Sequence, residues 1–263
     1  MVWLKAEYEF GSLFSCRMPD FSSQYALSSP LPAPSTIKLA IVSTAIMNTG
    51  NVEYGAKIFD SVKNSEIKIG LPKNIAVSNV LVKRLKMGDP SKQKTTLKGT
   101  CEGCGKKDVK LWLLKDVRKS FCKECATRLI STFGIRGYVH FLEPIEIYIN
   151  IKNGEEEIKD LLRRIRQFGT SDSLVCCKNI SEEEPLDGCV GAVDVFPESV
   201  NQSVVVVPVK DLNADKKIKF KHVNIYSEEK SNDVFVGKFY FIHVLKSKQG
   251  KNWVIYETSS EYD

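Results

Sequence analysis

The stretch CEGCGKKDVKLWLLKDVRKSFCKEC, residues 101–125, contains two Cys-x-x-Cys pairs separated by seventeen residues. Each pair can bend as a knuckle that directs two sulfurs toward one point, and four thiolates complete the closed tetrahedral shell of a structural zinc ion. The apolar run from Val109 to Leu114 predicts a strand between the knuckles, so the stretch is typical of a zinc ribbon. The four predicted zinc ligands are Cys101, Cys104, Cys122 and Cys125.

Two alternatives remain for these cysteines, namely unbound thiols and a redox pair. A zinc ion with four protein ligands has no open coordination position, so we expect it to stabilise a small lobe rather than to catalyse a reaction. The other cysteines are scattered, and we expect them to be buried free thiols. They are Cys16, Cys176, Cys177 and Cys189.

The N-terminus, MVWLKAEYEF, has acidic and aromatic residues where a secretory signal has a basic start and an apolar run. The longest nearly uncharged apolar stretch, Leu39 to Met47, is far shorter than a membrane span. We therefore expect a cytoplasmic protein without membrane contact, whose cysteines serve as thiols or metal ligands rather than as disulfides.

Positive charge is concentrated around the cysteine pairs. Residues 83–128 hold 14 Lys and Arg against 5 Asp and Glu, whereas the rest of the chain holds 24 against 27. This asymmetry predicts contact with nucleic acid, and the alternative for the ribbon itself is an acidic protein surface. Lysines on both sides of the turn Gly88-Asp89-Pro90 predict a basic β-hairpin. The hairpin residues expected to contact RNA phosphates are Lys83, Arg84, Lys86, Lys92 and Lys94.

Hydrophobic periodicity predicts an α+β fold. Residues 2–10 alternate as a strand, residues 11–34 form a long Ser- and Pro-rich loop, and residues 155–168 form an amphipathic helix stopped by Gly169. Residues 37–48 predict a buried helix capped by Ser35 or Thr36. Further elements are a helix at 52–62 and strands at 66–69, 75–85, 138–152, 174–178, 189–196, 204–209, 218–226, 234–246 and 253–257.

Two segments outside the ribbon carry a family resemblance. PLPAPSTIKLAIVSTAI, residues 30–46, follows a first strand and a long loop and precedes an apolar helix. Here Pro32, Pro34, Ser35 and Thr36 stand at the Pro-Pro-Ser/Thr-Thr element of CRISPR-associated protein family five, although Lys38-Leu39 stands where the family often has Gly. RRIRQFGTSDSLV, residues 163–175, resembles the same family's helix, Gly and Ser-containing strand. The glycine-rich loop common near the end of the wider RAMP superfamily is not visible.

The resemblance implies a ferredoxin-like (RRM-like) core at residues 1–70 and 135–180. It further implies an inserted basic hairpin thumb with the zinc ribbon at 71–134, and a β-rich C-terminal part at 181–263. By the same resemblance, the chain is a non-catalytic, archaeal subunit of a type I Cascade in antiviral defence. Such a subunit grips the 5′ handle of the CRISPR RNA, packs against backbone and large subunits, and reaches target DNA through the complex.

The residue types fit that expectation. A single-stranded RNA end needs cations for its phosphates and aromatic rings for its bases. The first loop offers Arg17 with Phe14, Phe21 and Tyr25. A helix start with free backbone amides is a phosphate seat, for which the candidates are Ser35, Thr36 and Lys38.

Two other functions stay open. A metal-independent CRISPR repeat endoribonuclease would need a general base, and among His140, His222 and His243 the lysine-flanked His222 is the best candidate. The sequence has no nucleophile triad, Gly-rich phosphate loop or paired acidic metal site, so we expect no enzymatic activity. A zinc-ribbon adaptor of the transcription or translation machinery is the other alternative.

Overall fold

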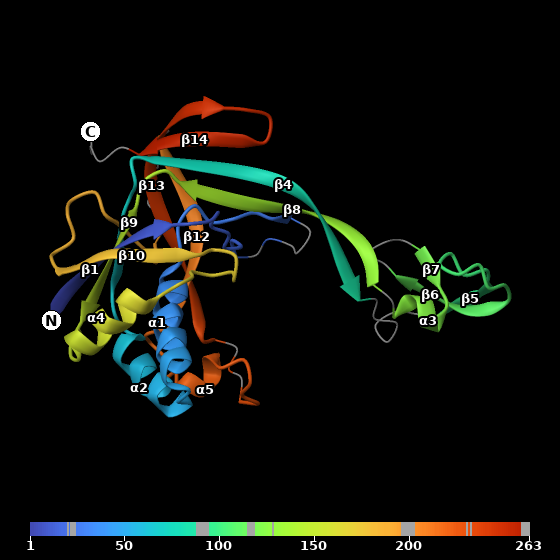
Figure 1. The fold of residues 1–263 in the computed structure, drawn as a ribbon, viewed down its shortest axis with the longest axis horizontal. Helices are drawn as coiled ribbons and strands as arrows, with labels where there is room; N and C mark the ends of the chain where they lie inside the picture. Colours follow the sequence, from blue (N-terminus) through green and yellow to red (C-terminus); the bar gives the residue numbers. More distant parts are fainter. Residues whose placement is uncertain are drawn as a thin grey trace. The chain divides into compact units, whose positions relative to one another are not determined.

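The computed structural model describes residues 1–19, 21, 25–87, 95–114, 119–127, 129–195, 203–229, 231 and 233–258. The described residues form three sheets, and Figure 1 shows a group of helices that lies against strands of the two larger ones. Within the described residues, no helix is both long and apolar enough to cross a membrane. The strand-rich mixture of helices and sheets confirms the expected α+β class.

The first sheet has the strand order β10-β1-β9-β3-β11. Its strands are β10 (Val175–Glu182), β1 (Val2–Phe10), β9 (Ile145–Ile151), β3 (Ile67–Gly70) and β11 (Val190–Gly191). All four neighbouring pairs are antiparallel. In chain order, β1 is followed by two helices, β3 and β9, and then by one helix and β10, which lies next to β1 in the sheet.

The helices cover one face of this sheet. They are α1 (Pro34–Thr49), α2 (Val52–Val62) and α4 (Glu155–Arg164), and α1 contacts both α2 and α4. Leu4, Ala6 and Tyr8 alternate along β1 and are fully buried, as the period-two pattern predicts. The Tyr8 hydroxyl donates to the Leu162 carbonyl at 2.7 Å and so joins the sheet to α4.

The opposite face of the first sheet is crossed by the chain itself. The connection between the edge strands β10 and β11, residues 183–189, runs past β1, β9 and β3, and Leu186 to Cys189 lie beside Glu146 of β9 and Gly70 of β3. Its Glu183 lies 3.4 Å from the Lys5 ammonium, which also pairs with Glu146 at 2.8 Å. Tyr148 beneath this segment is fully buried and donates to Glu146 at 2.8 Å.

The second sheet has the order β12-β13-β14-β4-β8-β2. Its strands are β12 (Val204–Leu212), β13 (Phe235–Gln249), β14 (Trp253–Thr258), β4 (Asn74–Met87), β8 (Leu129–Phe141) and β2 (Tyr25–Ala26). The predicted hairpin across Gly88-Asp89-Pro90 is wrong, because β4 pairs with β8 and β14 rather than with the strand that follows it. The turn itself lies outside the described residues.

The third sheet is small, with the order β5-β6-β7. It consists of β5 (Thr95–Gly99), β6 (Val109–Leu114) and β7 (Lys119–Phe121), followed by the single turn of α3 (Lys123–Ala126). The chain divides into two compact units, one of Met1–Phe21, Ala26–Val80 and Gly137–Asp263, the other of Leu81–Arg136 with Ser22–Tyr25. The third sheet belongs to the second unit.

Several predicted elements were wrong in type or extent. Residues 138–152 are two strands of different sheets, β8 and β9, rather than one. Residues 218–226 were expected to be a strand but contain α5 (Phe220–Val223), which contacts α2. Helix α4 ends at Arg164, and its C-cap is Ile165 rather than a residue near Gly169. Gly169 instead adopts a φ of 76° in the loop that follows.

Candidate functional site

The four predicted metal ligands lie together in the second unit. One sulfur from each of the four cysteines lies within 4.8 Å of all the others, and the Sγ atoms of Cys104 and Cys122 are 3.8 Å apart. A tetrahedron with zinc–sulfur bonds of about 2.3 Å has sulfur–sulfur edges of about 3.8 Å. The donor set and its spacing are therefore compatible with a zinc site.

Local backbone geometry holds the knuckles in place. Gly105 has a φ of 73°, and its N–H donates to the Cys101 carbonyl at 2.8 Å. A Cβ at Gly103 would lie 3.1 Å from the Cys125 sulfur, so a larger residue would press on the cluster. Burial raises the pKa of the Cys101 thiol, but N–H groups of Cys122, Cys104 and Gly103 donate to its sulfur and lower that pKa to about 6.

The apolar core around the cluster is small. Among the described residues, Leu111 is the one buried non-cysteine residue in that core, and Val109 and Phe121 pack against it while partly exposed. A lobe with so little buried apolar surface is typical of domains that a bound metal stabilises. The remaining cysteines are not all buried, contrary to expectation, because Cys176 is exposed and Cys16, Cys177 and Cys189 are partly so.

The start of α1 differs from the predicted phosphate seat. The helix begins at Pro34 after Ala33, so the predicted cap at Ser35 or Thr36 is wrong. Ser35 is buried, and its hydroxyl donates to the Lys210 carbonyl at 2.8 Å. A hydroxyl that is enclosed and already bonded in this way cannot reach an RNA phosphate.

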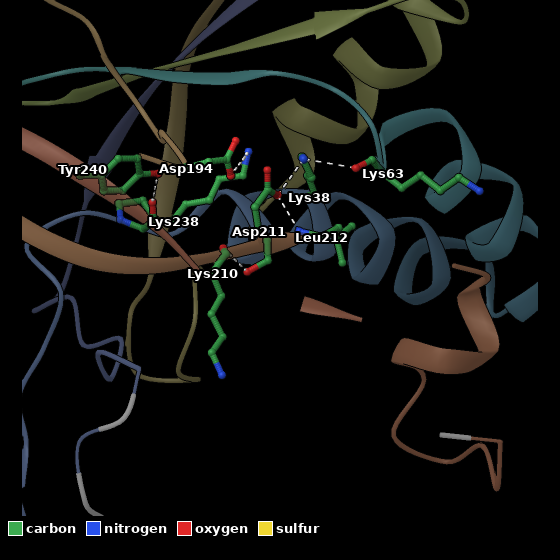
Figure 2. A network of polar contacts seen from close by, with 10 residues as sticks. Lys38, Lys63, Asp194, Lys210, Asp211, Leu212, Lys238 and Tyr240 are labelled. Carbon is green, nitrogen blue, oxygen red and sulfur yellow. Dashed lines mark hydrogen bonds and ion pairs between the residues drawn. The ribbon is translucent and has the colours of Figure 1, made fainter. Parts of the chain in front are cut away.

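Lys38 is also unavailable as a phosphate ligand, since its residue is 2% exposed. Its ammonium pairs with Asp211 at 2.8 Å and donates to the Lys63 carbonyl at 3.2 Å, as Figure 2 shows. Burial lowers the pKa of Lys38, while Asp211 opposes that shift. The pair joins α1 to β12 and so has a structural role.

Thr36 lies where three distant segments meet. Its hydroxyl is 3.8 Å from the Cys16 sulfur, and a Cβ at Gly169 would lie 3.5 Å from the Cys16 Cβ. The Ser15 N–H donates to the hydroxyl of Ser173, a fully buried residue, at 3.0 Å. The first loop, the beginning of α1 and the loop after α4 are therefore fastened together.

A groove of about 370 Å³ borders this junction. One side is a face of α1, with Thr36 and Leu39 near its start and Met47 near its end, and Met47 is 78% exposed. The other side carries two exposed guanidinium groups, those of Arg164 and Arg166. The remaining lining residues are Ala40, Ser43, Thr44, Asn48, Gln167 and Gly169.

Sequence reasoning missed Arg164 and Arg166 as binding candidates. Basic residues at the end of a helix have an ordinary explanation in the helix dipole, and their sequence position gave no reason to look further. The salt bridge from Arg164 Nε to Asp160 at 2.9 Å holds that guanidinium in position. Both arginines belong to the segment RRIRQFGTSDSLV, which is the signal that could have identified them.

The other predicted contact residues are scattered. Arg17 is exposed beside Cys16, and Lys83 is exposed on β4. Phe14 is fully buried and packs edge-on against Phe10 at 5.6 Å, so the expectation that it contacts bases is wrong. Phe21 and Tyr25 are 38% and 58% exposed. The side chains of Arg84 and Lys86, and all of Lys92 and Lys94, lie outside the described residues.

The three histidines are on different elements. His222 is half-buried in α5, and its Nδ1 accepts the Lys219 N–H at 3.2 Å. His140 is exposed on β8, and His243 is half-buried on β13. One ring nitrogen of His222, Nδ1, is therefore already engaged in a hydrogen bond at the start of its own helix.

Comparison with known proteins identifies a relative along nearly the whole chain. No family model matches. CRISPR-associated protein Cas5 from Archaeoglobus fulgidus is 36% identical over 261 residues, which cover 98% of this chain and 99% of that protein.

Two solved structures are also similar. A CRISPR protein from Archaeoglobus fulgidus superposes with a TM-score of 0.45 at 15% identity, covering 98% of this chain and 92% of that one. A chain of a Type III-B Cmr-beta structure, bound to cognate target RNA and AMPPnP, gives a TM-score of 0.29 at 11% identity, with coverage of 97% and 84%. These superpositions are too loose to carry an argument, so the assignment rests on the sequence relative. The family expected from the sequence is confirmed: this chain belongs to the CRISPR-associated protein Cas5 family.

Proposed function

We propose that the chain is a guide-RNA-binding subunit of a CRISPR effector complex, and that the groove beside α1 holds the 5′ handle of the CRISPR RNA. The observation that carries this proposal is the junction of three segments that are distant in sequence. The first loop, the start of α1 and the loop after α4 are fastened together through Cys16, Thr36 and Ser173. Two of these segments are the ones that resemble the family.

The chemistry of the groove suits a single-stranded RNA end. Guanidinium groups bind phosphates by two parallel hydrogen bonds and stack on bases. Arg164 and Arg166 supply such groups on one side, and the aliphatic face around Leu39 and Met47 offers an apolar surface on the other. A splayed base can lie against that surface while its phosphate meets the arginines.

The test is to coexpress the chain with its genomic neighbours and to sequence the RNA that copurifies. We expect a uniform population that begins with a repeat-derived 5′ handle, together with backbone and large subunits of a type I Cascade. RNA of random sequence, or none, would overturn this function and favour an adaptor role for the ribbon.

A pair of variants tests the groove itself. We expect R164Q/R166Q to lower RNA occupancy at least tenfold, because two cationic phosphate contacts are lost. R163Q is the matched control, since Arg163 is exposed on the same helix but does not line the groove. Equal occupancy in all three proteins would place the RNA elsewhere on the chain.

The four clustered cysteines are proposed to hold a structural zinc ion, with Cys101, Cys104, Cys122 and Cys125 as its ligands. The ion would supply the crosslink that the small core of the second unit lacks. We expect one zinc per chain by plasma mass spectrometry. We also expect C101S to lose the metal and to become protease-sensitive between residues 95 and 127. C176S is the control, because Cys176 is exposed outside the cluster; a metal content unchanged in C101S would exclude these ligands.

The first unit is proposed to contain the ferredoxin-like core at residues 1–70 and 135–180, with the segment 71–134 inserted. Support comes from the strand order β10-β1-β9-β3, which is the order expected when two β-α-β units pair their strands in this fold. We further propose that the chain is not an enzyme and works in the cytoplasm. Incubation of the purified chain with repeat RNA tests the first point, since cleavage abolished by H222A would establish an endoribonuclease.

A further inference from the structure

One face of the ribbon sheet combines cations with an aromatic ring. Lys98 on β5 lies directly opposite Lys110 on β6, and Trp112 lies opposite Phe121 on β7. Because Lys110 and Trp112 are two residues apart on one strand, their side chains share a face. Leu114 is two residues beyond Trp112 on β6, so Lys119 of β7, which lies opposite Leu114, is on the same face. Lys98, Lys110 and Lys119 are exposed, and Trp112 is half-buried.

The second feature of this face is how its lysines are paired. Within the part of the chain that the structure describes, no carboxylate forms an ion pair with Lys98, Lys110 or Lys119. Two acids of the ribbon are engaged elsewhere: Glu124 pairs with Lys106 at 3.2 Å, and Glu102 accepts the Ser120 N–H at 2.8 Å. Two like charges directly opposite on paired strands destabilise a sheet unless an anion lies between them.

We propose that this face is a second nucleic-acid surface, which binds the phosphate backbone of a single strand between Lys98 and Lys110 and places a base beside Trp112. Cations that follow a backbone, with an aromatic side chain between them, form the usual platform for single strands. Leu111, on the other face of β6, packs with the cysteines, while Trp112 and Phe121 pack against Ala126 of α3, which holds one edge of the aromatic ring in place. The surface uses none of the residues that line the groove beside α1.

Two charge-matched double variants of the full chain test this surface. K98Q/K110Q removes both opposed lysines, and K107Q/K123Q removes two exposed lysines of the same ribbon that lie outside its three strands. The probe is a fluorescein-labelled oligothymidylate of about ten nucleotides, titrated at several salt concentrations. We expect K98Q/K110Q to weaken binding about tenfold at 0.15 M salt and to lower the slope of log K against log salt by about 1.4, since each contact to a single strand contributes roughly 0.7. The control should change binding less than twofold.

Trp112 provides an independent readout, because the chain has three tryptophans. In a W3F/W253F background only Trp112 emits, and its fluorescence should be quenched when the oligonucleotide binds. Equal weakening in both double variants, or no quenching, would overturn the proposal. The proposal would also be overturned if K98Q/K110Q bound the oligonucleotide as tightly as wild type but no longer bound an acidic partner subunit. The face would then be a protein-binding surface. The zinc content of each variant verifies that the ribbon is intact. Loss of guide RNA in the groove variant R164Q/R166Q would not change the expected binding of the oligonucleotide to the ribbon, so the two proposals can fail separately.

Discussion

Removal of the Asp211 carboxylate should be among the most destabilising single changes in the first unit. D211A leaves the Lys38 ammonium enclosed, and among the described residues the Lys63 carbonyl at 3.2 Å is then its one remaining acceptor (Figure 2). The pair is well buried, since the Lys38 side chain is 2% and the Asp211 side chain 13% exposed. The loss of stability in D211A therefore measures the free-energy cost of an unpaired buried charge, not the contribution of one ion pair.

The magnitude follows from the distance. Two unit charges 2.8 Å apart attract by about 6 kcal/mol at an effective dielectric constant of about 20, before desolvation is subtracted. Breaking a buried pair by removing one partner costs about 3–5 kcal/mol in proteins, which corresponds to a Tm decrease of roughly 10 °C here. The double variant K38M/D211L removes both charges and should lose only about 1–2 kcal/mol. What remains is the loss of two hydrogen bonds, one to the Lys63 carbonyl and one from the Leu212 N–H.

Urea unfolding followed by far-ultraviolet circular dichroism measures the free energies, and hydrogen exchange locates the loss. Protection should fall first in α1 and β12, the elements that the pair joins. A D211A cost under about 1 kcal/mol, or a double variant as unstable as the sum of the singles, would refute the reasoning.

The same variant should respond to pH. Burial already lowers the pKa of Lys38 below 10.5, and loss of Asp211 removes the charge that opposes this shift. Above the lowered pKa the folded state then binds fewer protons than the unfolded state, so the stability of D211A should rise with pH up to about 10.5. A difference between D211A and wild type that stays constant from neutral to alkaline pH would contradict this.

Two further substitutions, one of them with a control, test the packing between the first loop, the sheets and α4. G137A should lower the free energy of unfolding by about 1–3 kcal/mol, because a Cβ there would collide with the backbone nitrogen of Ser28. The control G11A, which has open space around it, should change that free energy by less than about 0.5 kcal/mol in urea melts. Equal values for the two variants would mean that the loop shifts freely. Y8F should cost about 1–2 kcal/mol, because the buried hydroxyl that donates to Leu162 is lost, and a calorimetric Tm equal to that of wild type would contradict this.

Local patterns predicted some elements with their bounds. Residues 2–10 and 52–62 were correct at both ends, because each has a clear period and a turn signal behind it. The break inside residues 138–152 was missed although Pro144 marks it. The helix at Phe220–Val223 could not be read from KIKFKHVN, which alternates like a strand. Its position depends on tertiary contact, as Phe220 lies 6.1 Å from the Phe59 ring.

The two candidate sites, the cysteine cluster and the groove beside α1, also differ in how far the sequence predicts them. The cysteine cluster was predictable because its four ligands come in two short motifs whose spacing fixes their geometry. The groove was not, because it assembles from segments more than a hundred residues apart, and the side chains that line it have ordinary local explanations. Burial also cannot be read from sequence at Lys38, whose charge made it a surface candidate before β12 was known to cover it.

The insertion between β3 and β9 bears on how the core closes during folding. These strands are neighbours in the first sheet, although about seventy residues separate them along the chain. At the base of the insertion, the Leu142 N–H donates to the Asn74 carbonyl at 3.4 Å, and β4 and β8 pair above it. Once those arms pair, only short connections remain between β3 and β4 and between β8 and β9, so most of the entropic cost of closing the loop has been met by that pairing. The length of the insertion thus has little influence on core assembly, and one distal module can replace another at small cost in folding rate.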